Sequence, residues 1–501
     1  MVTGDVSLRS VAASGGRWGA VAAVAEQSAS VVTTALLARL LTPADFGVVA
    51  AAAVVVQFVA LATRFGFGAA VTKDATLDRR AVSSLFWVAG ALATAATLIA
   101  IAAAGPLASA VGVPHSRDVI AALVAVLPLN VLTSVVRGLL YRTFRYGALA
   151  ACDTAPVLAY GVVAIALAAA FDIGVWAVVI GRVAAAVVEF VLTIGYARFL
   201  PAIVFDVGAV RRELGFSFGY LGNFSANYAA KNLDYVAVGR MGGRELLGPY
   251  YVAYVLPNVL RQRLTWLAND VCFPILANVK DDAARMVRGY MRVARLQTFV
   301  AVPMLLGIAA AADEILEVFF GDRWSAAVVP LRLLAVAALI ESLTQLTTTT
   351  FLALGKPSQS FRINLIRLAV LLPALLVAAQ TGETSAVATA VVAAVVAAAV
   401  AAQVLLRRWL VVPARDLARA VGPQVVCGLA MVLAVVGART AVEDAGALAR
   451  LVLLGALGAA VYLGGGLVVF RSAFGECFAE ARGIFQRGER PPAEPLEPAV
   501  P

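Results

Sequence analysis

Charged side chains interrupt an apolar part of this sequence. Residues 227–243 read NYAAKNLDYVAVGRMGG, and they place Lys231 and Asp234 between two long apolar runs. On a helix these two residues are i and i+3, so they share a face, which Asn223 and Asn227 extend. A lysine flanked by amides can bind an anion, whereas a Lys–Asp salt bridge can simply hold helices together. The sequence leaves both interpretations open.

Other ionisable residues also fall inside apolar runs. A charge at the centre of a bilayer costs about 2.5–3.5 kcal/mol on insertion scales, so it normally faces a cavity or a partner. We expect Arg261 and Arg263 to join Lys231 in binding an anionic group, since arginine donates paired hydrogen bonds to phosphate. Glu26, Asp234 and Glu341 are the candidates for binding a coupling ion, H⁺ or Na⁺.

For the remaining intramembrane groups we expect structural roles. Arg182 and Glu189, two turns apart on one face, are predicted to pair with each other. Arg64, Arg332 and Arg367 lie near helix ends, where they are predicted to extend toward the membrane surface. The aromatic residues of the next run fit either stacking on sugars or anchoring at the membrane interface. They are Tyr250, Tyr251, Tyr254 and Trp266.

No residue pattern indicates catalysis. The four lysines precede Asp74, Asn232, Asp281 and Pro357, never Ser or Thr, so the Walker A sequence is missing. One histidine and four cysteines without paired spacing predict no metal site and no disulfide. We therefore expect a protein that is not an enzyme, with no cofactor.

The composition indicates a polytopic membrane protein. Of the 501 residues, 62% are hydrophobic and 14% charged, and the mean hydropathy is +0.90. Soluble domains are about 45–50% apolar and about 25% charged. The net charge is +10, but the basic residues lie in short connections between apolar runs, which argues against nucleic acid as a partner.

The apolar runs predict an all-α integral membrane protein with about 14 transmembrane helices. The expected ranges are 17–41, 44–66, 81–104, 118–138, 154–171, 173–197, 214–239, 248–272, 296–313, 326–353, 361–380, 384–406, 420–438 and 447–470. Most Lys and Arg residues fall in alternate connections, which predicts that both termini are cytoplasmic. Two amphipathic segments, 279–296 and 474–487, are expected to lie on the inner leaflet or to form solvated loop helices.

Two segments about 200 residues apart resemble each other. In LLARLLTPADFGVVAAAAVVV and VAVGRMGGRELLGPYYVAYVL, Arg39 corresponds to Arg240 and Gly47 to Gly248. A weaker sequence similarity relates residues 139–163 to 351–375, so we expect a parallel repeat of six helices. The predicted parts are a cytoplasmic N-terminus (1–16), an N-lobe (17–212), a C-lobe (213–412), two further helices (413–471) and a cytoplasmic tail with a disordered end (472–501).

At these segments the chain resembles the polysaccharide transporters (Wzx-type oligosaccharide flippases) of the multidrug/oligosaccharidyl-lipid/polysaccharide exporter superfamily. The matching stretches include ARLLTPADFG (38–47), RFGFGAAV (64–71), residues 232–260, FFGDRWSAAVVPLRLLA (319–335) and TTFLALGKPSQS (349–360). The resemblance implies two six-helix lobes around a central cavity, with two extra C-terminal helices, that rock between inward-open and outward-open states.

The resemblance also implies a location in the bacterial cytoplasmic (inner) membrane, a substrate and partners. The substrate would be an undecaprenyl-linked oligosaccharide with an anionic pyrophosphate, moved among membrane lipids, and a polymerase and glycosyltransferases would be partners. An exporter of drugs or metabolites from the same superfamily, a flippase for a lipid-linked peptidoglycan precursor, and a membrane-embedded glycosyltransferase or its scaffold are the alternatives. The excess of arginine over acidic residues favours an anionic lipid over organic cations.

Overall fold

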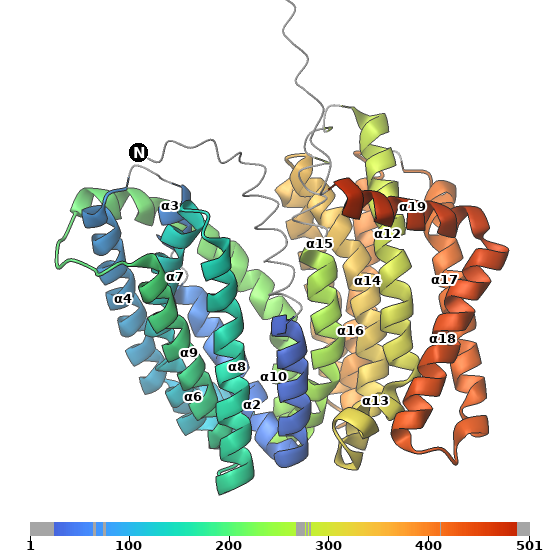
Figure 1. Ribbon diagram of the computed structural model, residues 1–501, viewed down its shortest axis with the longest axis horizontal. Coiled ribbons are helices and arrows are strands. Elements are labelled where there is room, and N and C mark those ends of the chain that lie inside the picture. The colour runs from blue at the N-terminus through green and yellow to red at the C-terminus, as the bar shows by residue number, and fades with distance from the viewer. Residues whose placement is uncertain are drawn as a thin grey trace, which may run out of the picture. The chain divides into compact units, whose positions relative to one another are not determined.

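The computed structural model describes residues 25–63, 67–73, 77–266, 276, 279, 282–410 and 412–487. Within these ranges all regular elements are helices (Figure 1). Eleven of them are long and apolar enough to cross a membrane. Large apolar side chains such as Leu433 and Val468 are 73% and 83% exposed, as expected for side chains that face lipid.

The described helices form two compact units. The first comprises Met1–Val259, Ala312–Leu334 and Asn364–Ala397, and the second comprises Leu260–Ala311, Ala335–Ile363 and Ala398–Pro501. The first unit contains residues 25–40, α2 (Pro43–Thr63), α3 (Phe67–Lys73), α4 (Arg79–Ala102), α5 (Ala104–Val111), η1 (Pro114–Ser116), α6 (Arg117–Val124), α7 (Leu127–Arg142), α8 (Tyr146–Phe171), α9 (Val175–Ala197), most of α10 (Val207–Trp266), α13 (Ala312–Phe319) and η3 (Asp322–Ala327). The second contains α12 (Ala283–Ala310), α17 (Ala414–Ala438), η4 (Thr440–Val442), α18 (Ala447–Val469) and α19 (Arg471–Arg487). Both units include parts of α14 (Val328–Ala353), α15 (Pro357–Ala378) and α16 (Thr384–Leu406).

The all-helical prediction is confirmed, and several bounds agree closely. The expected ranges 173–197, 384–406 and 447–470 became Val175–Ala197, Thr384–Leu406 and Ala447–Val469. The total of 14 spanning helices, the cytoplasmic location of both termini and the lobe boundaries stay predictions.

The start of α2 explains the TPADFG sequence. The backbone N–H of Asp45 donates to Thr42 Oγ1 at 3.2 Å, and the backbone N–H of Thr42 donates to Asp45 Oδ2 at 3.0 Å. This reciprocal arrangement satisfies two of the backbone donors that every helix start leaves unpaired. Pro43 follows Thr42 as the first helical residue, where its missing N–H costs nothing. The motif therefore stops one helix and starts the next within a few residues.

Four glycines allow helix backbones to touch at this end of the first unit, and we call them the glycine junction: Gly47, Gly112, Gly239 and Gly248. A Cβ atom at Gly47 would overlap the carbonyl oxygen of Arg244, and one at Gly248 would overlap that of Pro43. The two contacts are equivalent in the internal repeat. Pro43 corresponds to Arg244 and Gly47 to Gly248, because the two pairs have the same separation in the sequence. Glycine is required here because any larger residue would collide with backbone rather than with a flexible side chain.

The long helix α10 folds back on itself at a pair of glycines. Gly242 and Gly243 have non-helical backbone angles, and Gly243 has φ of 57°, in the region that favours glycine. The two arms of α10 on either side of this turn form a hairpin. Residues equally far from the turn on the two arms can therefore meet.

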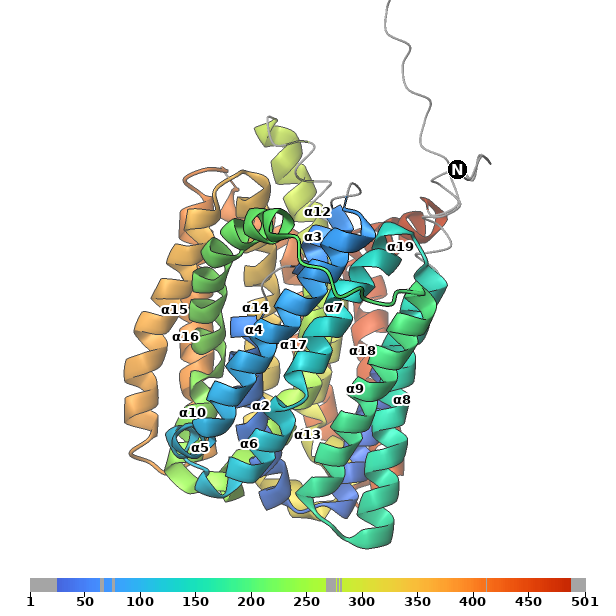
Figure 2. The same cartoon turned by 90° about the vertical axis from the view of Figure 1, so that its left-hand side faces the viewer.

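Helices α4, α7, α8 and α9 are packed side by side in the first unit (Figure 2). A core between α4 and α7 includes Leu85, Phe86, Val135 and Val136, all of which are buried. Small residues bring α8 and α9 together, because a Cβ at Gly181 would come within 2.9 Å of the Ala164 side chain. This packing fixes the relative positions of the polar groups on these helices.

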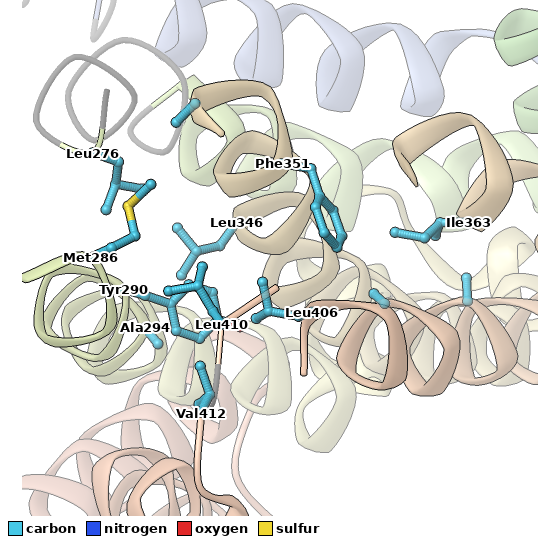
Figure 3. Close-up of a cluster of buried hydrophobic side chains, with 13 residues drawn as sticks. Leu276, Met286, Tyr290, Ala294, Leu346, Phe351, Ile363, Leu406, Leu410 and Val412 are labelled. Atoms are coloured by element: carbon cyan, nitrogen blue, oxygen red, sulfur yellow. The ribbon is translucent and has the colours of Figure 1, made fainter. Parts of the chain in front are cut away.

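The second unit is centred on an apolar cluster between α12, α14 and α16 (Figure 3). Met286, Tyr290, Leu346 and Leu406 are among its buried members. The Tyr290 hydroxyl lies 3.0 Å from Thr347 Oγ1, and Gln403 Nε2 donates to it at 3.1 Å. The buried hydroxyls are thus paired within the core, as low-dielectric surroundings require.

The prediction for residues 279–296 was wrong for its described part. This segment does not form a separate helix on the leaflet: it is the first half of α12, which runs from Ala283 to Ala310. Asp282 starts the helix by accepting the N–H of Arg285 at 2.9 Å, and this bond lowers the pKa of Asp282 below its usual value. The buried residues Met286, Tyr290 and Ala294 continue into the apolar face of the span, so the amphipathic pattern reflects core packing.

The second amphipathic segment lies in α19, a separate helix across the ends of α12 and α17 (Figure 1). Phe474 is fully buried there, and its ring packs edge-on against Phe299. Arg295 forms an ion pair with Glu476. The apolar face of α19 therefore contacts helices of its own unit.

Candidate functional site

The α10 hairpin buries Asp234 beside a cluster of tyrosine side chains. Asp234 is 4% exposed, and its Oδ2 accepts the hydroxyl of Tyr250, on the opposite arm, at 2.7 Å. The other carboxylate oxygen, Oδ1, is buried and has no hydrogen-bond partner in the described structure. A buried carboxylate oxygen without a donor is costly unless it receives a proton or a cation.

The tyrosines of this hairpin pack on one another. The ring of Tyr235 meets those of Tyr250 and Tyr254 edge-on, with centroids 5.5 Å and 5.4 Å apart. Tyr250 is fully buried, so it neither stacks on a sugar nor anchors the helix at a membrane interface, and both expectations are wrong for this residue. The side chain of Trp266 lies outside the described part of the structure.

Arg367 was predicted to extend toward the membrane surface, and this is wrong. It is 7% exposed, and its positive charge acts on the carboxylate of Asp234. Sequence spacing gave no indication of this arrangement, because Asp234 and Arg367 lie on different helices, α10 and α15. Arg332, another residue expected to extend to the surface, is 40% exposed and forms an ion pair with Asp313.

A second half-buried charge pair lies in the second unit. Arg261 Nε is 3.7 Å from Glu341 Oε2, and the two side chains are 13% and 15% exposed. They come from α10 and α14. The structure therefore places an expected anion-binding residue beside an expected ion-coupling residue.

The rest of the predicted site is described less fully. Asn223, Asn227, Lys231 and Arg263 lie on α10, but their side chains are outside the described part of the structure. Glu26 is half-buried in the helix of residues 25–40. The roles assigned to these residues stay predictions.

Three charged residues on α7, α8 and α9 form a cluster that the sequence did not predict. Arg137 Nη2 is 2.5 Å from Asp153 Oδ1, and its Nη1 is 3.1 Å from Glu189 Oε1. The expected Arg182–Glu189 pair is wrong, because the Arg182 guanidinium instead lies 4.5 Å from the centroid of the Tyr160 ring. Asp153 falls one residue before the expected span 154–171, so it was not considered an intramembrane charge.

The described residues contain no group of three or more His, Cys, Asp or Glu side chains arranged to hold a metal ion. Their ionic clusters instead combine arginine with carboxylates. Such an arrangement suits the binding of anions or protons.

Comparison with known proteins identifies the class. Residues 36–329 match the family described as "Polysaccharide biosynthesis protein", so the chain belongs to that family, and the family resemblance is confirmed. The chain is 28% identical to the succinoglycan biosynthesis transport protein ExoT of Rhizobium meliloti (strain 1021) over 306 residues, which cover 61% of this chain and 62% of ExoT. It is 22% identical to the lipopolysaccharide biosynthesis protein WzxC of Escherichia coli (strain K12) over 75% of this chain and 76% of WzxC.

Among solved structures, the lipid II flippase MurJ in an inward closed conformation has a similar fold. The TM-score is 0.74 at 12% identity, over 91% of this chain and 99% of MurJ. At this identity the likeness concerns the fold alone. The fold is that of a multi-helix membrane protein, in agreement with the apolar helices described above.

Proposed function

We propose that this protein is a flippase that moves an undecaprenyl-pyrophosphate-linked oligosaccharide across the bacterial cytoplasmic membrane, for the synthesis of a surface polysaccharide. The observation that carries the proposal is the family match over residues 36–329. The names of ExoT and WzxC, which refer to succinoglycan transport and lipopolysaccharide biosynthesis, support a glycan as the cargo. Glycosyltransferases upstream and a polymerase downstream are the partners that such a step requires.

The charged residues of α10 supply the chemistry that this cargo needs. A pyrophosphate that leaves the headgroup region loses its hydration, and cationic side chains with amide neighbours replace part of it. In our proposal Lys231, Arg261 and Arg263 bind the pyrophosphate, assisted by Asn223 and Asn227. Glu26, Asp234 and Glu341 are the carboxylates proposed to bind the coupling ion, and the unpartnered oxygen of Asp234 supports its inclusion.

Alternating access requires one end of the transporter to open. In the described structure the glycine junction is closed by direct backbone contact. Trp324 and Arg323 reinforce this end by donating to the carbonyl oxygens of Ala38 at 3.1 Å and of Leu41 at 3.3 Å. We propose that release of the cargo follows separation of this junction.

The Arg261–Glu341 pair allows a direct test of the proposed binding site. In cells that lack the protein, we expect the lipid-linked oligosaccharide to accumulate on the cytoplasmic leaflet, and the wild-type gene to relieve this. Arg261→Ala should fail to relieve it, since the phosphate loses its donor. The double variant Arg261→Ala/Glu341→Ala removes both members of this ion pair, so it tests whether the pair serves only to hold the helices together.

If Arg261 binds the cargo or Glu341 binds the coupling ion, the double variant stays inactive although its membrane abundance returns to the wild-type level. If Arg261 serves only to pair with Glu341, the double variant regains both abundance and transport, which would contradict the proposed site. Export of a cationic dye by the wild-type protein, with no effect on the oligosaccharide, would instead favour a drug exporter.

A further inference from the structure

The cluster of Arg137, Asp153 and Glu189 contains one positive group and two acidic groups. One guanidinium divides its two terminal nitrogens between two carboxylates, Asp153 at 2.5 Å and Glu189 at 3.1 Å. Each carboxylate thus receives one bond and keeps a second oxygen. With both carboxylates ionised the cluster carries one net negative charge, which is unfavourable at membrane depth.

The three residues lie at matching depths. Asp153 is seven residues from the start of α8, Glu189 eight residues from the end of α9, and Arg137 five residues from the end of α7. At 1.5 Å per residue these positions lie roughly 8–12 Å inside the same end of the bundle. That end contains the connections predicted to be cytoplasmic. The side chains of Asp153 and Glu189 keep 38% and 29% of their surface exposed, so a small ion can reach them.

The neighbouring arginines whose side chains are described are directed elsewhere. Arg142 donates to the carbonyl of Leu77, Arg145 to that of Tyr196, and Arg79, on α4, to that of Leu200. Arg182 lies over the Tyr160 ring. Lys73, on α3, has a side chain outside the described part of the structure.

The other titratable groups described near the cluster do not supply a positive charge. Two of these groups, Tyr141 on α7 and Cys152 on α8, interact with the charged residues of the cluster. The helix of residues 25–40 contacts α8 where Thr33 approaches Gly161. Glu26 lies on this helix and has a partner of its own. The charges that act on Glu189 are those of Arg137 and Asp153.

We propose that Arg137, Asp153 and Glu189 form a proton-binding site, in which one carboxyl group holds a proton while the other pairs with Arg137. A proton from water adds to a free carboxylate oxygen, and no bond of the protein breaks. None of these residues was among the expected ion-coupling groups. The idea that this site drives transport rests on the proposed function. The existence of the proton-binding site does not, so proton binding can be tested without any cargo.

The test is infrared spectroscopy of the purified full chain in detergent, with the pH lowered from about 9 to about 5. The wild-type protein should gain a carbonyl band of a protonated carboxylic acid. Glu189→Gln and Asp153→Asn are near-isosteric, and each leaves Arg137 with one carboxylate. We therefore expect each variant to lose an intensity equivalent to one carboxyl group per molecule.

Glu245→Gln is the matched control, because the Glu245 side chain is 68% exposed; in this variant the membrane-buried component of the band should be unchanged. An unaltered band in both Glu189→Gln and Asp153→Asn would overturn the proposal. Disappearance of the band in sodium but not in potassium buffer would also overturn it, since the bound ion would then be Na⁺. Transport of the oligosaccharide is measured separately, so failure of one proposal leaves the other standing.

Discussion

Replacing Trp324 by alanine is expected to lower the free energy of unfolding by about 3–5 kcal/mol. The side chain is fully buried, its ring meets Phe46 edge-on with centroids 5.2 Å apart, and its Nε1 donates to the carbonyl of Ala38 at 3.1 Å. The variant loses the ring contacts and leaves a cavity where η3 meets the end of the helix of residues 25–40. Denaturant unfolding in mixed micelles measures the change.

Trp87→Ala is the control for this experiment. Trp87 also donates its Nε1 to a backbone carbonyl, that of Ala202, at 3.1 Å, but its side chain is 41% exposed. The hydrogen bonds are matched, so the difference between the two variants isolates burial of the ring. We expect the control to lose less than half as much stability, and an equal loss would contradict the structural role of Trp324.

Adding a methyl group at Gly248 or Gly47 is expected to open the glycine junction. In Gly248→Ala the new Cβ would overlap the carbonyl oxygen of Pro43, and in Gly47→Ala it would overlap that of Arg244. Overpacking costs about 1–3 kcal/mol, which corresponds to a shift of roughly 5- to 150-fold in an equilibrium between closed and open states. Transport should fall, because the closed state is required in each cycle.

The shift can be measured by thiol labelling. Val111 is 5% exposed, and its carbonyl faces Gly239 within the junction, so Val111→Cys should react slowly with a membrane-impermeant reagent. Gly248→Ala should accelerate this reaction from the side predicted to be outside. Gly455→Ala, in open space within α18, should leave it unchanged. Equal labelling rates in the two variants would show that the junction does not gate access.

Sequence patterns predicted the elements of this fold well, because membrane helices depend on local composition. Apolar runs of sufficient length became helices such as α9, α16 and α18. The expected ranges 17–41 and 44–66 predicted a short connection at TPADFG, and the cap of α2 forms there between residues three apart. The sequence repeat aligned Gly47 with Gly248, and in the structure both glycines make close backbone contacts within the glycine junction.

The charge partners were harder to predict, because they depend on which helices become neighbours. Periodicity along α9 indicated Arg182 as the partner of Glu189, whereas α7 supplied Arg137 instead. Arg367 is near the end of its predicted span, yet it is buried where its charge acts on Asp234. In both cases the sequence revealed a charge at membrane depth but not the helix that compensates it.

Translocation by the purified protein tests the central claim most directly. The protein is reconstituted into liposomes that contain an undecaprenyl-pyrophosphate-linked disaccharide, and a membrane-impermeant enzyme reports how much of this lipid is accessible from outside. The account predicts that the protected inner-leaflet fraction becomes accessible with the wild-type protein and remains protected with Arg261→Ala/Glu341→Ala. If the wild-type protein is correctly folded and the inner fraction stays as protected as in protein-free liposomes, the account is contradicted.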